Sequence, residues 1–133
     1  MAQDSHDKAI ISCEAYSKGQ SMILTLTTTA NTLNSPLVSI LIRSTDRETL
    51  QQTLNSVAAQ SYDAIEVWVV AAKADHQPVP NQIGRFPLHF AVTTEALRRS
   101  QAANKALGLA RGERILFLDD DDWITPTHVE VLI

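Results

Sequence analysis

From residue 37 onward the chain alternates short apolar runs with longer amphipathic stretches, and this alternation constrains its fold more than any other feature. The runs 37–42 and 65–70 are rich in apolar and β-branched residues, which is typical of buried strands. The stretch between them places four apolar residues on one face of a helix: Leu50, Leu54, Val57 and Ala58. Strand, helix and strand in that order predict an α/β, Rossmann-like fold with a mainly parallel sheet and helices on both faces.

The second half of the chain continues the same pattern. Residues 73–85 contain two prolines and a glycine and predict a loop, whereas 88–92 predicts a short third strand. Residues 95–111 predict a helix that ends at Gly112. The apolar face of that helix is expected to consist of Ala103, Ala106, Leu107 and Ala110. The apolar run 115–118 predicts a fourth strand.

Helix starts are predicted from capping patterns. Thr45 and Glu48 have the spacing of a capping box for the first helix. Thr125 as N-cap and Pro126 at the first helical position predict a last helix towards the end of the chain.

The first 35 residues differ from the rest. The stretch 22–29 could be a short strand or part of a helix, because a short apolar run does not decide between the two. Asn34, Ser35 and Pro36 form a loop-like boundary. We therefore expect an N-terminal extension or linker over 1–35, and one ordered domain over 36–133 that begins at Leu37.

Four consecutive aspartates, Asp119 to Asp122, follow the fourth predicted strand. Like charges this close repel one another, so a bound cation or hydrogen-bond donors must neutralise them. In an extended stretch Asp119 and Asp121 share one face, and Asp120 and Asp122 share the other. Open α/β sheets bind ligands at the carboxyl ends of their strands, and carboxylate oxygens suit Mg²⁺ or Mn²⁺. The run predicts a metal site beside a substrate phosphate.

The acidic run also allows other interpretations. A solvated acidic turn is the simplest one. A calcium loop of the EF-hand type fails because it needs glycine at its sixth position, where Ile124 stands. A phosphatase with an aspartate nucleophile would carry this motif on its first strand, and here at least two strand–helix units come first.

Composition narrows the range of partners. The formal net charge of −4 and the scattered basic residues argue against a nucleic-acid partner. The histidines are also scattered, and no Cys/His spacing suits zinc. The start of the chain lacks the pattern of a signal peptide, and no apolar stretch approaches the roughly 18 residues of a membrane span, so we expect a cytoplasmic protein with no transmembrane segment.

Three motifs in order carry a family resemblance: SVAAQSY, ARGERILFLDDDDW and the turn from Trp123 to Pro126. With the strand pattern around them, residues 36–133 resemble the nucleotide-binding half of family 2 glycosyltransferases of the GT-A fold. The resemblance implies transfer of a sugar from a nucleotide diphosphate sugar to an acceptor, which is unknown here. It also implies a DXD motif, here Asp119-Asp120-Asp121, that holds the donor through Mg²⁺ or Mn²⁺.

Individual roles follow from the same resemblance. Asp121 is the expected metal ligand, and Asp119 or Asp120 is expected to contact the ribose or to share the cation. Asp122 is expected to fix the turn. Donor contacts are further expected from basic and polar residues at the neighbouring strand and helix ends, namely Arg43, Thr45, Asp46, Arg98 and Arg99.

Two departures from the family pattern stand out. Ala71 and Ala72 replace the aspartate pair that usually binds the base, so Ala72 would line an altered base site. The family's second half, which binds the acceptor and usually supplies the catalytic base, is expected beyond Ile133, so that the chain resembles an inactive fragment when isolated. The alternative is a non-catalytic interaction or regulatory domain that retains the fold.

Overall fold

The computed structural model of the chain describes residues 11–15, 21–26 and 35–133. Those residues form a seven-stranded sheet in the order β1-β2-β7-β3-β4-β6-β5. The strands are β1 (Ile11–Ala15), β2 (Ser21–Leu26), β3 (Val38–Ser44), β4 (Ile65–Ala71), β5 (Gln82–Ile83), β6 (Phe86–Ala91) and β7 (Arg114–Asp119). The helices are α2 (Leu50–Ala58), α3 (Arg99–Leu109) and α4 (His128–Leu132). No helix in the described part of the chain is both long and apolar enough to span a membrane.

The centre of the sheet is parallel, as the sequence predicts. Strand β3 pairs in parallel with β4 on one side and with β7 on the other, and β4 pairs in parallel with β6. The chain therefore moves outward from β3 to β6 and then crosses back to the far side of β3. The topological switch point lies between β3 and β7, and ligands of open α/β sheets bind beyond the carboxyl ends of such strands.

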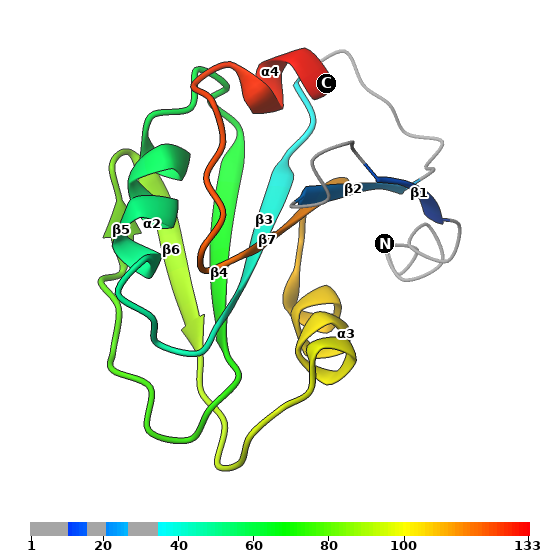
Figure 1. Cartoon of the computed structure of the whole chain (residues 1–133). Coiled ribbons are helices and arrows are strands. Elements are labelled where there is room, and N and C mark those ends of the chain that lie inside the picture. The colour runs from blue at the N-terminus through cyan, green and yellow to red at the C-terminus, as the bar shows by residue number, and fades with distance from the viewer. Residues whose placement is uncertain (1–10, 16–20, 27–34) are drawn as a thin grey trace.

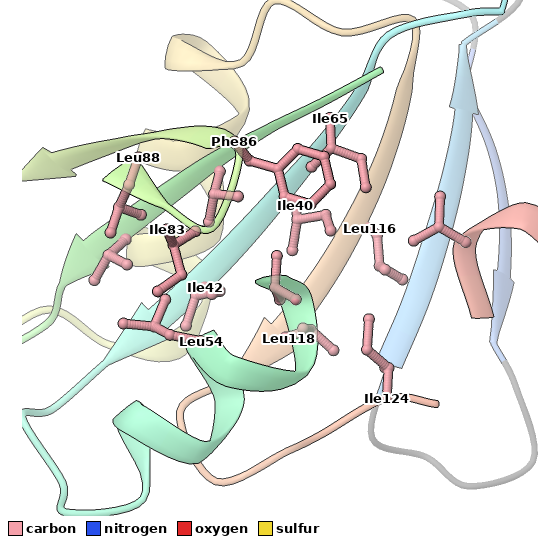
Figure 2. Close-up of a cluster of buried hydrophobic side chains, with 14 of the residues drawn as sticks. Ile40, Ile42, Leu54, Ile65, Ile83, Phe86, Leu88, Leu116, Leu118 and Ile124 are labelled. Atoms are coloured by element: carbon pink, nitrogen blue, oxygen red, sulfur yellow. The ribbon is translucent and has the colours of Figure 1, made fainter. Parts of the chain in front are cut away.

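Two hydrophobic clusters cover the two faces of the sheet, with α2 on one side and α3 on the other (Figure 1). The larger cluster packs α2 onto β3, β4 and β7, with Leu54 beside Ile42 and with Leu118 near Ile124 (Figure 2). The smaller cluster packs the alanines of α3 against Leu41, Val70 and Ile115. Burial of each large apolar side chain contributes about 1.5–3 kcal/mol, so these clusters fix the ends of β3 and β7 next to each other.

The predicted capping box of α2 is wrong. The helix begins at Leu50 after Thr49, which makes no side-chain cap hydrogen bond. Thr45 instead donates its backbone N–H to the Asp120 carboxylate. The loop after β3 is therefore shaped by a contact with β7 that capping patterns do not reveal.

Helix α3 also starts later than predicted, at Arg99 rather than residue 95. The N–H of Leu97 donates to the carbonyl of Ala72, which holds the preceding segment out of the helix. Of the predicted apolar face, Ala106 and Ala110 are buried and Leu107 packs against the same cluster, but Ala102 is buried in place of Ala103.

Gly112 does not end α3, which stops three residues earlier. Its position lies so close to β3 that an added Cβ atom would sit 2.6 Å from Ser39 Oγ and 2.7 Å from the Leu37 carbonyl oxygen. The Gly112 N–H donates to Ser39 Oγ, and Ser39 donates to Glu66, which also accepts three hydrogen bonds from Arg111. We call Ser39, Glu66, Arg111 and Gly112 the amino-end network, because it lies at the amino ends of β3 and β4.

Three further boundaries differ from the prediction. Strand β5 lies within the predicted loop 73–85, and β6 starts at Phe86, two residues before the predicted strand. Helix α4 begins at His128 after Thr127, so Thr125 is not its N-cap.

The sheet also extends into the N-terminal part of the chain. Strand β2 pairs antiparallel with β7, and β1 pairs antiparallel with β2. The expectation that the ordered fold begins at Leu37 is therefore wrong, because the outer edge of β7 is occupied by a strand from the first 35 residues. The predicted boundary residue Asn34 lies outside the described residues.

Candidate functional site

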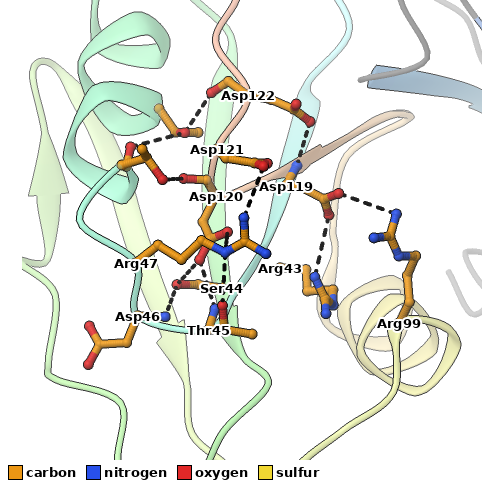
Figure 3. Close-up of polar contacts among 12 residues, drawn as sticks. Arg43, Ser44, Thr45, Asp46, Arg47, Arg99, Asp119, Asp120, Asp121 and Asp122 are labelled. Atoms are coloured by element: carbon orange, nitrogen blue, oxygen red, sulfur yellow. Dashed lines mark hydrogen bonds and ion pairs between the residues drawn. The ribbon is translucent and has the colours of Figure 1, made fainter.

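The acidic run forms a tight turn at the carboxyl end of β7. The N–H of Asp122 donates to the Asp119 carbonyl over 3.1 Å, and the N–H of Asp119 donates to Oδ2 of Asp122 over 3.0 Å. We call residues 119–122 the acidic turn. It faces the loop after β3, because β3 and β7 are adjacent parallel strands (Figure 3).

Asp120 fastens the acidic turn to that loop. Its side chain is fully buried, and its Oδ2 accepts hydrogen bonds from the Thr45 N–H at 2.8 Å and from Ser44 Oγ at 3.1 Å. Its backbone carbonyl accepts the Thr49 hydroxyl at 2.8 Å. The other carboxylate oxygen, Oδ1, accepts no hydrogen bond within the described residues, although Arg47 Nε lies 3.5 Å away. A fully buried carboxylate oxygen without a donor is costly and calls for a compensating charge.

The remaining three carboxylates converge. Asp119, Asp121 and Asp122 each offer an oxygen atom that lies within 4.8 Å of the other two. Asp122 is buried, Asp119 is partly buried and Asp121 is exposed, so this group of oxygens opens towards solvent on one side. Asp122 therefore both fixes the turn and belongs to the convergent group.

Three arginines surround this group of carboxylates. Arg43 Nη1 lies 3.8 Å from Asp119 Oδ1, and Arg99 Nη1 lies 3.3 Å from Asp119 Oδ2. Arg47 Nη1 lies 3.0 Å from Asp121 Oδ2. Arg43 comes from the end of β3, Arg47 from the loop that follows and Arg99 from the start of α3 (Figure 3). Four acids thus meet three cations from three separate segments.

The pKa of the Asp122 carboxyl group is raised by its surroundings in the acidic turn. Burial raises its pKa above the ordinary value of 3.8, and repulsion from Asp119 and Asp121 acts in the same direction. The Asp119 N–H and the Arg99 charge only partly oppose this rise in pKa. A further cation near Asp119 and Asp121 would relieve this repulsion.

Asp46 has a structural role outside the acidic turn. It has a positive φ of 68°, an uncommon conformation that aspartate tolerates better than most residues. Its carboxylate points away from the turn (Figure 3) and accepts the Gln77 N–H at 3.0 Å. His76 Nδ1 lies 3.8 Å from the same carboxylate, and His76 Nε2 lies 2.6 Å from Ser44 Oγ. The loop after β4 therefore braces the residue that holds Asp120.

Ser44, His76 and Asp46 contact one another in space in the sequence of a serine–histidine–aspartate hydrolytic triad. Their environment does not suit a nucleophile, however. Ser44 is fully buried, and its Oγ accepts the Asp46 N–H while bonding to Asp120. A serine nucleophile must reach a substrate carbonyl, and this hydroxyl is enclosed by the protein. The three residues therefore support the acidic turn.

The structure brings together most of the residues that the sequence singles out. Arg43, Thr45, Asp119, Asp120 and Asp121 all contribute to the acidic turn or to its partners.

Three other candidates lie apart from the acidic turn. Asp46 faces the loop after β4, as described above. The N–H of Ala72 donates to the Ser44 carbonyl at 2.7 Å, and the carbonyl of Ala72 accepts the Leu97 N–H at 2.9 Å. Arg98 caps α3 by donating its backbone N–H to Gln101, and the described ion pairs of the turn do not include it.

Sequence reasoning missed Arg47, Ser44 and His76. Ser44 is the last residue of β3 and Arg47 lies in the loop that follows it. Polar residues at the ends of strands that flank a switch point are the available signal for both. His76 carries no such signal, because it stands in a loop with no recognisable spacing to its partners.

Comparison with known proteins agrees with this geometry. The sequence profile described as Glycosyl transferase family 2 matches residues 39–133. EpsH of Bacillus subtilis (strain 168), which bears the name of a glycosyltransferase, is 33% identical over 105 residues, covering 76% of this chain and 30% of EpsH. The chain therefore spans less than a third of the length of that relative.

Solved structures show the same fold. Residues 1–349 of S. aureus TarS superimpose with a TM-score of 0.62 at 24% identity, covering 72% of this chain and 31% of TarS. The same TarS segment in complex with UDP gives a TM-score of 0.60 at 25% identity, covering 72% of this chain and 30% of TarS. The parallel sheet with its helices thus matches the GT-A fold. Together with the profile match over most of its length, this places the chain in glycosyltransferase family 2.

Proposed function

We propose that this chain carries the donor-binding part of a glycosyltransferase that transfers a sugar from a nucleotide diphosphate sugar to an acceptor. The observation that carries the proposal is the acidic turn at the switch point, where four carboxylates meet three arginines. The solved complexes of TarS with UDP and with UDP-GlcNAc support this class of donor.

The residues of the turn fit a hard divalent cation. Asp119, Asp121 and Asp122 offer convergent oxygen atoms, and the buried Oδ1 of Asp120 in the same turn accepts no hydrogen bond within the described residues. Carboxylates in this number suit Mg²⁺ or Mn²⁺, with open positions for phosphate oxygens. We propose Asp121 and Asp119 as the main ligands. A bound cation of this kind supplies stabilisation of the negative charge on the departing nucleotide diphosphate.

The protein's own groups position the diphosphate. Arg43 and Arg99 approach Asp119 from β3 and from α3, so they frame the opening of the turn. Guanidinium groups bind phosphate oxygens in pairs, which orients the leaving group. Asp120 and its hydrogen bonds to Ser44 and Thr45 keep this frame rigid. We propose that the acceptor site and the general base belong to the remaining length of a protein such as EpsH.

Calorimetric titration with uridine diphosphate tests the proposal. The chain should bind uridine diphosphate in the presence of Mn²⁺ and lose that binding in excess chelator. The Asp121→Ala variant should weaken Mn²⁺ binding by at least about tenfold, because it removes an exposed charged ligand. Asp63→Ala is the matched control, since Asp63 is an exposed acid that pairs with Arg85 away from the turn.

Unchanged Mn²⁺ affinity in Asp121→Ala would reject the ligand assignment. If the affinity for uridine diphosphate is the same with and without the chelator, and is also unchanged in Asp121→Ala, the metal-assisted site is rejected. The isolated chain should show no transfer of sugar to an acceptor, since the general base is assigned elsewhere.

A non-catalytic interaction domain is the alternative, and Ala72 favours it. Its N–H and carbonyl are both used by Ser44 and Leu97, so this position offers the base neither a carboxylate nor those backbone groups. The two functions separate in the same titration. A domain that has lost donor binding would bind neither Mn²⁺ nor any nucleoside diphosphate.

A further inference from the structure

Arg47 pairs with Asp121, one of the three carboxylates that converge at the acidic turn. Its Nη1 lies 3.0 Å from Asp121 Oδ2, and its Nε lies 3.5 Å from Asp120 Oδ1 (Figure 3). The guanidinium group thus spans two neighbouring carboxylates. No other arginine among the described ion pairs contacts either of them.

The contact with Asp120 is one of charge alone. The single Nε hydrogen of Arg47 is directed to Thr45 Oγ1 at 3.3 Å, and Asp120 Oδ1 remains without a hydrogen-bond donor although it is fully buried. Arg47 therefore balances the charge of Asp120 without satisfying its oxygen. A buried carboxylate oxygen without a hydrogen-bond donor gains free energy when a donor or a cation binds to it.

Arg47 is also placed so that it can move. It lies in the loop after β3, directly after Asp46, and half of its side chain, 51%, is exposed. Exposed ion pairs contribute little to stability, so the bond to Asp121 is easily exchanged. Arg43, by contrast, has a side chain that is only 21% exposed.

We infer that Arg47 is an exchangeable counter-ion of the acidic turn: a divalent cation displaces it from Asp121, and the released guanidinium group then binds the diphosphate of the nucleotide. The inference rests on the proposed function and assigns a role to a residue of that site. A guanidinium group and a divalent cation carry the same sign of charge, so they compete for Asp121. A diphosphate brings the opposite charge into reach of the displaced side chain and accepts its paired N–H groups.

The Arg47→Gln variant tests the inference through two affinities that move in opposite directions. With Mn²⁺ alone as the probe, its affinity for the metal should rise at least about threefold, because the competing charge is gone. With uridine diphosphate in saturating Mn²⁺, its affinity for the nucleotide should fall about tenfold, because a charge-assisted contact is lost. A residue with a merely structural role would lower both affinities together.

Two further variants serve as controls. Lys73→Gln removes one positive charge from an exposed position and should change neither affinity by more than about twofold. Arg47→Lys keeps the charge and loses the planar fork, so its Mn²⁺ affinity should stay near that of the parent while nucleotide affinity falls.

The possible failures are distinguishable. Lower Mn²⁺ affinity in Arg47→Gln, or no change in either affinity, would overturn the inference while leaving the proposed function intact. A parent chain that binds neither Mn²⁺ nor uridine diphosphate would overturn both. Thermal unfolding of each variant checks that the fold is retained.

Discussion

The central parallel strands carry a polar cluster at each end of the sheet: the amino-end network at β3 and β4, and the acidic turn at the carboxyl ends of β3 and β7. The two clusters are built in different ways. At the amino end, Glu66 is buried and accepts four hydrogen bonds, one from Ser39 and three from Arg111. At the carboxyl end, Asp120 is equally buried, yet its Oδ1 accepts none within the described residues. A saturated carboxylate stabilises the fold, whereas an unsaturated one remains available to a ligand.

The pKa of Glu66 at the amino end and the pKa of Asp122 at the carboxyl end are shifted in opposite directions. Burial alone would raise the pKa of Glu66, but the hydrogen bonds from Ser39 and Arg111 outweigh it and lower the pKa below 4.5. Burial raises the pKa of Asp122, and the neighbouring carboxylates add to the rise. The amino end thus stabilises its charge internally, and the carboxyl end is left short of positive charge.

The largest expected effect comes from breaking the amino-end network. Glu66→Gln replaces an acceptor of four hydrogen bonds with an amide and leaves Arg111 without its ion pair, which should lower the free energy of unfolding by about 3 kcal/mol. Urea unfolding at pH 7 measures the loss. Under conditions where the variant is folded, its Mn²⁺ affinity should match the parent. A loss of metal binding in folded Glu66→Gln would mean that the two ends are coupled.

The same variant gives a pH dependence with a defined sign. Because folding lowers the pKa of Glu66, its stabilisation is fully present above the unfolded value near 4.5 and is lost as the pH falls through the folded value. The stability gap between parent and Glu66→Gln should therefore be constant above about pH 5.5 and should narrow as the pH falls below 4.5. A gap that widens in acid would contradict the assignment of a charged, hydrogen-bonded Glu66.

Gly112→Ala should have the next largest effect. The added methyl group would meet Ser39 Oγ at 2.6 Å and the Leu37 carbonyl at 2.7 Å. That carbonyl cannot easily yield, because it accepts hydrogen bonds from the N–H groups of Glu113 and Arg114. We expect a loss of about 2 kcal/mol in thermal or urea unfolding. Gly108→Ala is the matched control, since an added Cβ there meets nothing within 4 Å. That control should be neutral or slightly stabilising, because alanine favours helices.

Selectivity for the nucleotide base should be weak at the carboxyl end. Ala71 and Ala72 offer no carboxylate to the base, and the N–H and carbonyl of Ala72 are already used by Ser44 and Leu97. Competition between uridine and guanosine diphosphate in excess Mn²⁺ should give less than about tenfold discrimination, or roughly 1.4 kcal/mol. A strong uridine preference that survives both Asp46→Ala and Arg98→Ala would mean that other backbone groups read the base.

The smallest expected effect is on stability at the acidic turn itself. Asp121→Asn loses its ion pair with Arg47 but also loses repulsion from its neighbours, and Asp121 is exposed. The free energy of unfolding should change by less than about 0.5 kcal/mol. A large loss in urea unfolding would show that the turn is part of the stabilising framework, which would erase the contrast between the two ends.

Much of the fold follows from local sequence patterns. The strands β3, β4 and β7 are predictable because apolar β-branched residues on both faces of a strand require burial. Local patterns place the start of α3 too early, because the hydrogen bond between Leu97 and Ala72 that delays the helix is a tertiary contact. The place of β2 in the sheet depends on its pairing with β7, which is likewise far away in the sequence.

The candidate site was predictable in part for the same reason. The acidic run marks its own position, because clustered charge needs a counter-charge. Its partners are set by tertiary geometry: Arg47 meets Asp121 across 74 residues of chain, and no local residue pattern encodes that contact. His76 reaches Ser44 through a loop whose path depends on tertiary packing.

The position of β7 beside β3 also has a consequence for the order of folding. The bonds that join the acidic turn to the loop after β3 span 71 to 76 residues of chain. Contacts at such separation carry a high loop-closure entropy and form late, after local helices and neighbouring strands. During synthesis, β3, α2 and β4 can associate while β7 is not yet made. The nascent chain therefore has no acidic turn until β7 inserts between β3 and β2, and insertion of this strand completes the sheet and the turn in a single step.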